Sequence, residues 1–343
     1  MRILIASSST IPGYSGGWTT TLDMLGDRHE AMYLIVETRP GIHSMEGVEY
    51  LGLGLAKKRK FVPPVRLILL LRKVISPLAL KWTFRRFNAD FVLCLDEDIG
   101  FSAKKTGLPY AMRFHTRIDP GVNNKKIEGL LKGALFSTVC HGASIPGVEE
   151  ILHNQDLSRF NYAPAVKPER VLLLTCINDI HEPDLFVEGI SLSKSLRGDI
   201  IGTGPAKKRI EKVCRQTGGR VRVLDPVPRL KLGQLSGQYQ IGVATLKSYA
   251  KSVYQMKVNM YLACGMHTVV KPFTHIAKEA PELVDIFSTP RELADRLDEI
   301  TGRWRELEER RKKAREWVME NYSVEKPRAK FEKILKHTFP NYR

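Results

Sequence analysis

The sequence has few cysteines and no pattern typical of disulfide-rich, zinc-binding or membrane-spanning proteins. Among 343 residues there are only five cysteines, and no two of them are close together: Cys94, Cys140, Cys176, Cys214 and Cys264. Their odd number, and the absence of a CxxC motif or a His/Cys cluster, argue against a disulfide framework and a zinc site. All except Cys214 lie in apolar runs, so we interpret them as reduced core residues of a cytosolic protein.

Long apolar runs are also missing. No stretch approaches the roughly 20 apolar residues that a membrane span requires. The N-terminal run MRILIASSS is short and leads into a Gly-rich turn, so we do not interpret it as a signal peptide. Short-period repeats are absent. We therefore expect a cytoplasmic globular protein.

Acidic residues are scarce relative to basic ones. The chain has 54 Lys and Arg against 37 Asp and Glu, a net charge of +17. Such a surface favours anionic partners, which include nucleotide phosphates, anionic lipid headgroups and nucleic acid. The basic residues are spread along the chain and no nucleic-acid-binding motif is present, so we do not expect a nucleic-acid partner. The length predicts about two domains.

Short β-branched and aromatic runs alternate with helical segments along the whole chain. The first half contains six predicted strands: Arg2–Ala6, Ala31–Val36, Val48–Gly52, Asp90–Leu95, Pro109–Phe114 and Leu135–Cys140. The second half contains six more: Val171–Cys176, Asp199–Gly202, Arg220–Leu224, Gln240–Leu246, His267–Lys271 and Asp285–Phe287. This alternation predicts an α/β protein with two Rossmann-like domains, joined near the proline-containing stretch Asn161–Pro168.

Two segments of the first half lie where a parallel sheet binds ligands, at the carboxyl ends of its strands. The first strand leads into SSSTIPGYSGGW, where Gly16 and Gly17 allow close approach of a ligand to the backbone. The alternative is a flexible turn, since the spacing is not that of a dinucleotide fingerprint. His115 ends another strand, where it could meet a sugar hydroxyl or phosphate, with Asp119 as a nearby general base. A structural role for His115 is the alternative.

A basic segment of the second half, residues 249–272, combines a helix with cations. This helix follows a strand, so its first N–H groups point to where an anion would lie. Lys247, Lys251 and Lys257 could supply positive charge there, and Gly265 is predicted to end the helix. The alternative is an ordinary solvated basic face.

These motifs, in this order, resemble those of GT-B glycosyltransferases, in particular family 4 (GT4). The pattern K-x-x-x-Y-L-x-x-G, which begins at Lys257, is similar to the family's donor-site helix. The segments SSSTIPGYSGGW, GLPYAMRFHT, IIGTGPAKKRIEKV, VRVLDPVPRL and REWVMENYSVEKP are similar to successive family motifs, so the resemblance covers nearly the whole chain.

The resemblance implies two Rossmann-like domains facing across a cleft. Residues 1–162 would bind the acceptor, residues 163–322 the nucleotide sugar, and a helix in 323–343 would cross back to the first domain. It implies transfer from a nucleotide-diphosphate sugar to a glycan or lipid-linked acceptor, without an obligatory metal or another cofactor. His115 or Asp119 would act as base if the configuration inverts; a retaining reaction would need no dedicated base. The implied donor-binding residues are Gly16, Gly17, Gly204, Pro226, Val227, Lys251, Tyr254, Lys257 and Asn259.

The sequence departs from the GT4 pattern at the donor site. The family's two glutamates, eight residues apart, fall on Ser252 and Met260, which carry no carboxylate. The usual Arg and Lys fall in residues 175–183, which contain Asn178, Asp179 and His181 instead. The second hypothesis is therefore a GT-B scaffold or ligand-binding subunit that has lost turnover.

A basic and aliphatic segment, residues 57–86, could contact an anionic membrane surface. It begins with a basic block, Lys57–Lys60, and continues as aliphatic residues interrupted by Lys and Arg. Pro77 is predicted to divide it into two helices. The alternative is one or two core helices, and the exposure of Trp82 and Phe84 distinguishes the two.

Overall fold

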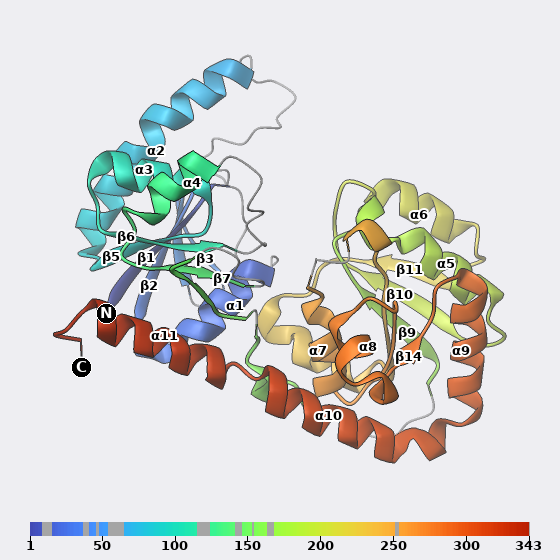
Figure 1. The fold of residues 1–343 in the computed structure, drawn as a ribbon. Coiled ribbons are helices and arrows are strands. Elements are labelled where there is room, and N and C mark those ends of the chain that lie inside the picture. The colour runs from blue at the N-terminus through green and yellow to red at the C-terminus, as the bar shows by residue number, and fades with distance from the viewer. Residues whose placement is uncertain are drawn as a thin grey trace. The chain divides into compact units, whose positions relative to one another are not determined.

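A computed structural model gives the fold of the chain (Figure 1). It describes residues 1–8, 16–36, 41–45, 48–53, 65–114, 124–140, 146–152, 154–162, 168–250 and 254–342. The chain forms two compact units: unit 1 is Met1–Asn154 with Val324–Arg343, and unit 2 is Gln155–Ser323. Each unit is built around its own sheet. Within the described ranges, no helix combines the length and apolar character needed to cross a bilayer.

Unit 1 contains an eight-stranded sheet with the strand order β3-β4-β2-β1-β5-β6-β7-β8. All neighbouring strands are parallel except the β3–β4 pair, which is antiparallel. The strands are β1 (Arg2–Ser7), β2 (Glu30–Ile35), β3 (Gly41–Met45), β4 (Val48–Gly52), β5 (Phe91–Cys94), β6 (Tyr110–Phe114), β7 (Ser137–Val139) and β8 (Val148–Glu150).

Helices cover both faces of this sheet. One face packs against α2 (Val65–Phe87), α3 (Glu97–Thr106) and α4 (Asn124–Leu131) through a core that includes Leu80, Ile99 and Leu130. The other face packs against α1 (Gly16–Leu25) and α11 (Glu325–Thr338), with Met24 and Phe331 in its core. Both faces of β1 are apolar, because successive side chains of a strand point to opposite faces: Leu4 lies in one core and Ile5 in the other.

Unit 2 contains a six-stranded, fully parallel sheet with the order β11-β10-β9-β12-β13-β14. Its strands are β9 (Arg170–Leu174), β10 (Arg197–Ile201), β11 (Val221–Leu224), β12 (Ile241–Ala244), β13 (His267–Val270) and β14 (Asp285–Ile286). Its helices are α5 (Pro183–Leu192), α6 (Lys207–Arg215), α7 (Met256–Ala263), α8 (His275–Glu279), α9 (Pro290–Gly302) and α10 (Glu308–Tyr322). The 3-10 turns of the chain are η1 (Gly26–Arg28), η2 (Leu157–Arg159), η3 (Asp179–His181), η4 (Arg229–Gly237), η5 (Ser248–Ala250), η6 (Pro281–Leu283) and η7 (Trp304–Leu307).

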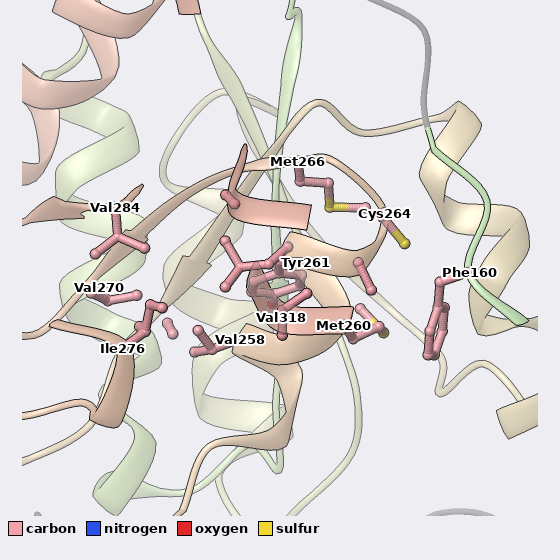
Figure 2. Close-up of a cluster of buried hydrophobic side chains, with 14 of the residues drawn as sticks. Phe160, Val258, Met260, Tyr261, Cys264, Met266, Val270, Ile276, Val284 and Val318 are labelled. Atoms are coloured by element: carbon pink, nitrogen blue, oxygen red, sulfur yellow. The ribbon is translucent and has the colours of Figure 1, made fainter. Parts of the chain in front are cut away.

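The core beneath α7 holds unit 2 together on one face of its sheet (Figure 2). Tyr261 of α7 is fully buried there, beside Val258, Met260 and Val318. Its hydroxyl accepts a 2.7 Å hydrogen bond from the backbone N–H of Leu174, at the end of β9. The helix is therefore tied to the last residue of a central strand.

The structure confirms the twelve predicted strands and corrects three expectations. The sequence analysis missed β3 and β8, which lie at the two edges of the unit 1 sheet. The predicted break at Pro77 is wrong: α2 runs through Pro77 as one helix, so the missing N–H of this buried ring is tolerated. Cys176 is exposed, because β9 ends at Leu174. Cys214, which the sequence analysis set apart from the apolar runs, is buried.

Candidate functional site

The carboxyl edge of the unit 2 sheet gathers the loops that follow β9, β10 and β12. The β9 loop is held against the β10 loop by a 2.9 Å hydrogen bond from the Ile177 N–H to the Thr203 carbonyl. It is held against the β12 loop by a 2.9 Å bond from the Lys247 N–H to the Ile180 carbonyl. In open parallel sheets this edge is where ligands bind.

Two glycines allow this close packing of backbone on backbone. A Cβ atom added to Gly202 would lie 1.8 Å from the Thr175 carbonyl oxygen, and Gly202 also has a φ of +156°. A Cβ on Gly204 would lie 2.4 Å from the Ile177 carbonyl oxygen. Gly204 was predicted to bind the donor; its close packing against the β9 loop already explains why a glycine stands there.

Lys257 lies in the first turn of α7 and is the most unusual charged residue at this edge. Its Nζ atom is buried and has no hydrogen-bond partner in the part of the chain that the structure describes. Burial lowers the pKa of the Lys257 amine from 10.5 to about 7, and the nearby Cys176 thiol opposes this only weakly. A buried amine without a partner is costly unless a further group satisfies it.

His181 ends the turn η3 and contributes to the same electrostatic environment. Burial, and to a smaller extent the charge of Lys257, lower the pKa of its imidazole to about 4, although a hydrogen bond to the Thr245 backbone partly opposes both effects. Its Nδ1 atom is buried and has no hydrogen-bond partner among the described residues. The turn is fixed in place by the Thr245 hydroxyl, which donates to the His181 carbonyl. The imidazole is therefore neutral at pH 7.

Tyr254 and Asn259 belong to a network of polar and aromatic side chains. The Asn259 amide donates a 2.7 Å hydrogen bond to the Tyr254 hydroxyl, and its carbonyl oxygen lies 2.8 Å from His275 Nε2. The rings of Tyr254 and His275 lie 4.4 Å apart between centroids. Asn259 is buried and its side-chain oxygen and nitrogen are both occupied, so a role at the donor for either residue stays a prediction.

The remaining predicted donor residues lie at several places. Pro226 and Val227 follow β11 at the same carboxyl edge, and Val227 packs partly against the core. The preceding Asp225 forms a 2.6 Å ion pair with Lys207. Lys251 lies outside the described residues.

In unit 1, the predicted glycines open a helix and the predicted catalytic pair is not seen. Gly16 and Gly17 are the first residues of α1, which follows β1. His115 and Asp119 lie outside the described residues. Asp96, which follows β5, caps α3: its carboxylate accepts from the Ile99 N–H at 3.1 Å and from the Ser7 hydroxyl at 3.1 Å. This structural role accounts for its position at the end of β5.

The sequence analysis did not select His181 as a binding residue. It noted His181 only as part of a segment without the expected Arg or Lys. Its position shortly after the central strand β9 was the available signal, because loops after central strands lie at the ligand-binding edge. Among the described residues, no group of three or more His, Cys, Asp or Glu side chains is arranged to hold a metal ion.

Comparison with known proteins identifies the fold. No protein-family model matches the chain, and no curated protein matches its sequence. Solved structures do match. HepE of Anabaena, in complex with UDP and glucose, aligns with a TM-score of 0.73 at 11% identity, over 98% of this chain and 100% of that one. Sucrose-phosphate synthase from Thermosynechococcus elongatus aligns with a TM-score of 0.73 at 11% identity, over 99% and 100%.

The chain has the GT-B fold. The lipopolysaccharide outer core galactosyltransferase WaaB also aligns, with a TM-score of 0.56 at 12% identity over 99% of this chain and 100% of that one. These likenesses confirm the predicted fold class, an α/β protein with two Rossmann-like domains. At such low identity they show the fold alone.

Proposed function

We propose that the chain is a glycosyltransferase that moves a sugar, a hexose, from a nucleotide-diphosphate sugar to an acceptor hydroxyl. The observation that carries this proposal is the buried amine of Lys257, which has no partner among the described residues and lies at the carboxyl edge of the unit 2 sheet. The GT-B fold supports the same conclusion, and HepE, with this fold, binds UDP. The Lys257 amine would meet the donor's diphosphate.

The proposed chemistry is electrostatic stabilisation of the leaving group. The bond between the sugar's anomeric carbon and the phosphate oxygen breaks, a bond to the acceptor oxygen forms, and the proton of the acceptor hydroxyl passes to a base or to the departing diphosphate. Negative charge grows on the departing diphosphate, and an ammonium group fixed in a buried site stabilises it strongly. A bound diphosphate raises the pKa of the Lys257 amine and holds it protonated. The neutral His181 imidazole next to it can donate or accept a hydrogen bond.

In this proposal the protein's own cations do the work that a metal ion does in other transferases. Neither a metal nor a cofactor beyond the nucleotide sugar is part of it. The five cysteines are all free, which favours a reducing compartment such as the cytoplasm. The acceptor would be a glycan or a lipid-linked molecule.

Turnover of nucleotide sugars tests this proposal. The full chain is incubated with UDP-, GDP- and CMP-linked sugars, with and without Mg²⁺, and the released nucleotide is measured. We expect release from one diphosphate donor without Mg²⁺, a fall of at least about 100-fold in Lys257→Met, and little change in Lys212→Met, an exposed lysine of α6. Donor binding without turnover would instead support the inactive scaffold. That hypothesis rests on the missing family glutamates, one of which is replaced by Met260, a residue buried in the core.

The surface of α2 supports a partner for this enzyme, an anionic membrane. Val74, Leu78 and Trp82 are 59%, 64% and 50% exposed, and their spacing of four places them on one face of α2. Phe84, by contrast, packs against the core of unit 1. Exposed apolar side chains in a row are the signature of an interfacial contact.

Basic side chains border this apolar row. Lys81, Arg85 and Arg86 line the same shallow hollow as Leu78 and Trp82, and the Arg86 guanidinium lies 5.1 Å from the Trp82 ring centroid. Each basic residue near an anionic bilayer contributes about 1 kcal/mol. We propose that this face of α2 docks on anionic lipid headgroups, where a lipid-linked acceptor is found.

Co-sedimentation with vesicles tests the docking. We expect the full chain to bind phosphatidylglycerol vesicles, to bind phosphatidylcholine vesicles weakly, and to dissociate as salt rises. Leu78→Glu should reduce binding, whereas Ile42→Glu, at a similarly exposed position of β3, should not. Equal binding by both variants, or no binding to either vesicle, would refute the docking and leave the transferase proposal untouched.

A further inference from the structure

Two arginines of the described chain are almost fully buried, and they differ in how their charge is compensated. Arg113 and Arg311 are each 1% exposed. Arg311 donates 3.1 Å from Nη1 to the Gly265 carbonyl, pairs with Glu308, and lies 4.3 Å from the Trp304 ring centroid. For Arg113, neither Nη1 nor Nη2 has a hydrogen-bond partner in the part of the chain that the structure describes.

Arg113 lies in β6, one residue before the strand ends, on the face of the unit 1 sheet that α1 covers. Its Nε donates a 3.2 Å hydrogen bond to the hydroxyl of Thr21 in α1. Ala111, two residues earlier and therefore on the same face, packs in the core shared with α1 and α11. The side chain is thus held by one hydroxyl, with its two terminal nitrogens left over.

A second unpartnered group lies beside it. Thr138 of β7 is the register partner of Arg113, so both side chains project from the same face of the sheet. Thr138 is buried, and its Oγ1 has no hydrogen-bond partner among the described residues. The adjacent strands β6 and β7 therefore place the two terminal nitrogens of Arg113 and the hydroxyl of Thr138 on one face, all three without a hydrogen-bond partner among the described residues.

The nearby titratable thiol does not neutralise this charge. Burial raises the pKa of the Cys140 thiol to about 11, even though the charge of Arg113 lowers it, so Cys140 is neutral at pH 7. The guanidinium cannot lose its proton in a protein. No carboxylate among the described residues forms an ion pair with it, and a buried charge without a counter-ion is strongly unfavourable. The described residues therefore supply no counter-ion to Arg113, which leaves this role to a bound anion.

We propose that Arg113, together with Thr138, binds the oxyanion of a ligand in unit 1. Two parallel N–H groups match a phosphate or carboxylate in bidentate fashion, and a hydroxyl can complete the shell. This rests on the proposed function and on the acceptor role that the family resemblance implies for residues 1–162, and it assigns an acceptor that carries a phosphate or a carboxylate. Thr21 is a positioning residue, because it touches the Arg113 Nε and leaves both terminal nitrogens for the anion.

Thermal unfolding in different salts tests the proposal. The full chain with Lys257→Met removes the other proposed anion site and serves as the background. Its melting temperature is measured in sodium chloride, sodium phosphate and sodium acetate at equal ionic strength, with and without Arg113→Met. We expect phosphate, acetate or both to raise the melting temperature by a few degrees only when Arg113 is present. The double variant corrects for the general stabilising effect of phosphate on proteins.

The pattern of shifts decides the ligand class and the proposal itself. A shift with phosphate alone assigns a phosphate group, and a shift with acetate alone assigns a carboxylate. In chloride, Arg113→Met should be at least as stable as its background, because it removes an unpaired charge, whereas Arg311→Met should be clearly less stable. Equal shifts with and without Arg113 would overturn the proposal. If Arg113→Met does not fold, Arg113 is a structural arginine and the proposal is equally overturned.

Failure of the transferase proposal is distinguishable from failure of this one. Binding of nucleoside diphosphate to unit 2 is measured separately in the protein with Lys257 intact. Its absence would contradict the proposed function, while an Arg113-dependent anion shift would still stand.

Discussion

Replacing Lys257 by methionine should stabilise the ligand-free protein while it removes nucleotide binding. Methionine has a similar length and no charge, so it fills the space of the lysine stem and needs no hydrogen bond. The gain arises because burial of the amine costs free energy, as its lowered pKa of about 7 shows. A residue that is unfavourable for folding and favourable for function is the usual signature of a binding site.

The size of the gain follows from the two pKa values. The amine titrates near 10.5 in the unfolded chain and near 7 in the folded one. The unfolded chain therefore holds more protons between these pH values, and stability rises with pH across this window. At pH 8 the cost amounts to about 3 kcal/mol, at about 1.36 kcal/mol per pKa unit. Below pH 7 the full cost of about 5 kcal/mol applies, and above pH 10.5 it vanishes.

Thermal unfolding of the wild type, Lys257→Met and Lys212→Met measures this difference. For a unit of this size, about 3 kcal/mol corresponds to a rise in melting temperature of roughly 6–12 °C at pH 8. The gain should shrink as the pH approaches 10.5. Lys212→Met should behave like the wild type throughout, since that side chain is exposed. A Lys257→Met variant that is no more stable than the wild type at pH 8, or whose gain does not depend on pH, would refute the reasoning.

Two further predictions concern the frame of the site. Gly202→Ala should destabilise unit 2 by about 3 kcal/mol or more, because its Cβ would clash with the Thr175 carbonyl, while Gly302→Ala, with open space around it, should be neutral in urea denaturation. Burial alone would raise the pKa of the Asp199 carboxyl, but hydrogen bonds from Arg222 and a neighbouring tyrosine bring it below its usual value. The ionised carboxylate therefore contributes to folding stability above pH 4, and this contribution is lost in acid. Asp199→Asn should therefore cost about 3 kcal/mol at pH 7, and progressively less in acid unfolding curves.

The fold could be predicted from local patterns because both sheets are parallel and buried. Each central strand is a short continuous apolar run bounded by turns, and the helix between two strands follows from its own periodicity. The edge strands β3 and β8 were missed because both are weakly apolar, and β8 has only 3 residues. Pro77 was misinterpreted because the sequence does not show that tertiary packing holds α2 continuous through a buried proline.

The candidate site was predicted only in part. Lys257 could be selected because it opens a helix after a strand, which the sequence shows. Its unmet hydrogen bonds, and the proximity of His181, depend on how three loops pack and have no signal in a single sequence. The same holds for Arg113, since a charged residue in a strand reveals neither its burial nor the absence of a partner. His115 and Asp119 stay predictions.

Titration calorimetry with UDP tests the central claim most directly, that a diphosphate binds at the carboxyl edge of unit 2 through Lys257. The full chain is titrated at pH 7.0 in two buffers of different ionisation enthalpy, so that proton uptake is measured with binding. We predict saturable binding with a net uptake of protons, since the pKa of the Lys257 amine is lowered to about 7 in the free protein and a bound diphosphate raises it. Both the uptake and most of the affinity should be lost in Lys257→Met. Absence of binding by UDP, GDP and CMP alike, or binding that Lys257→Met leaves unchanged, would contradict the account.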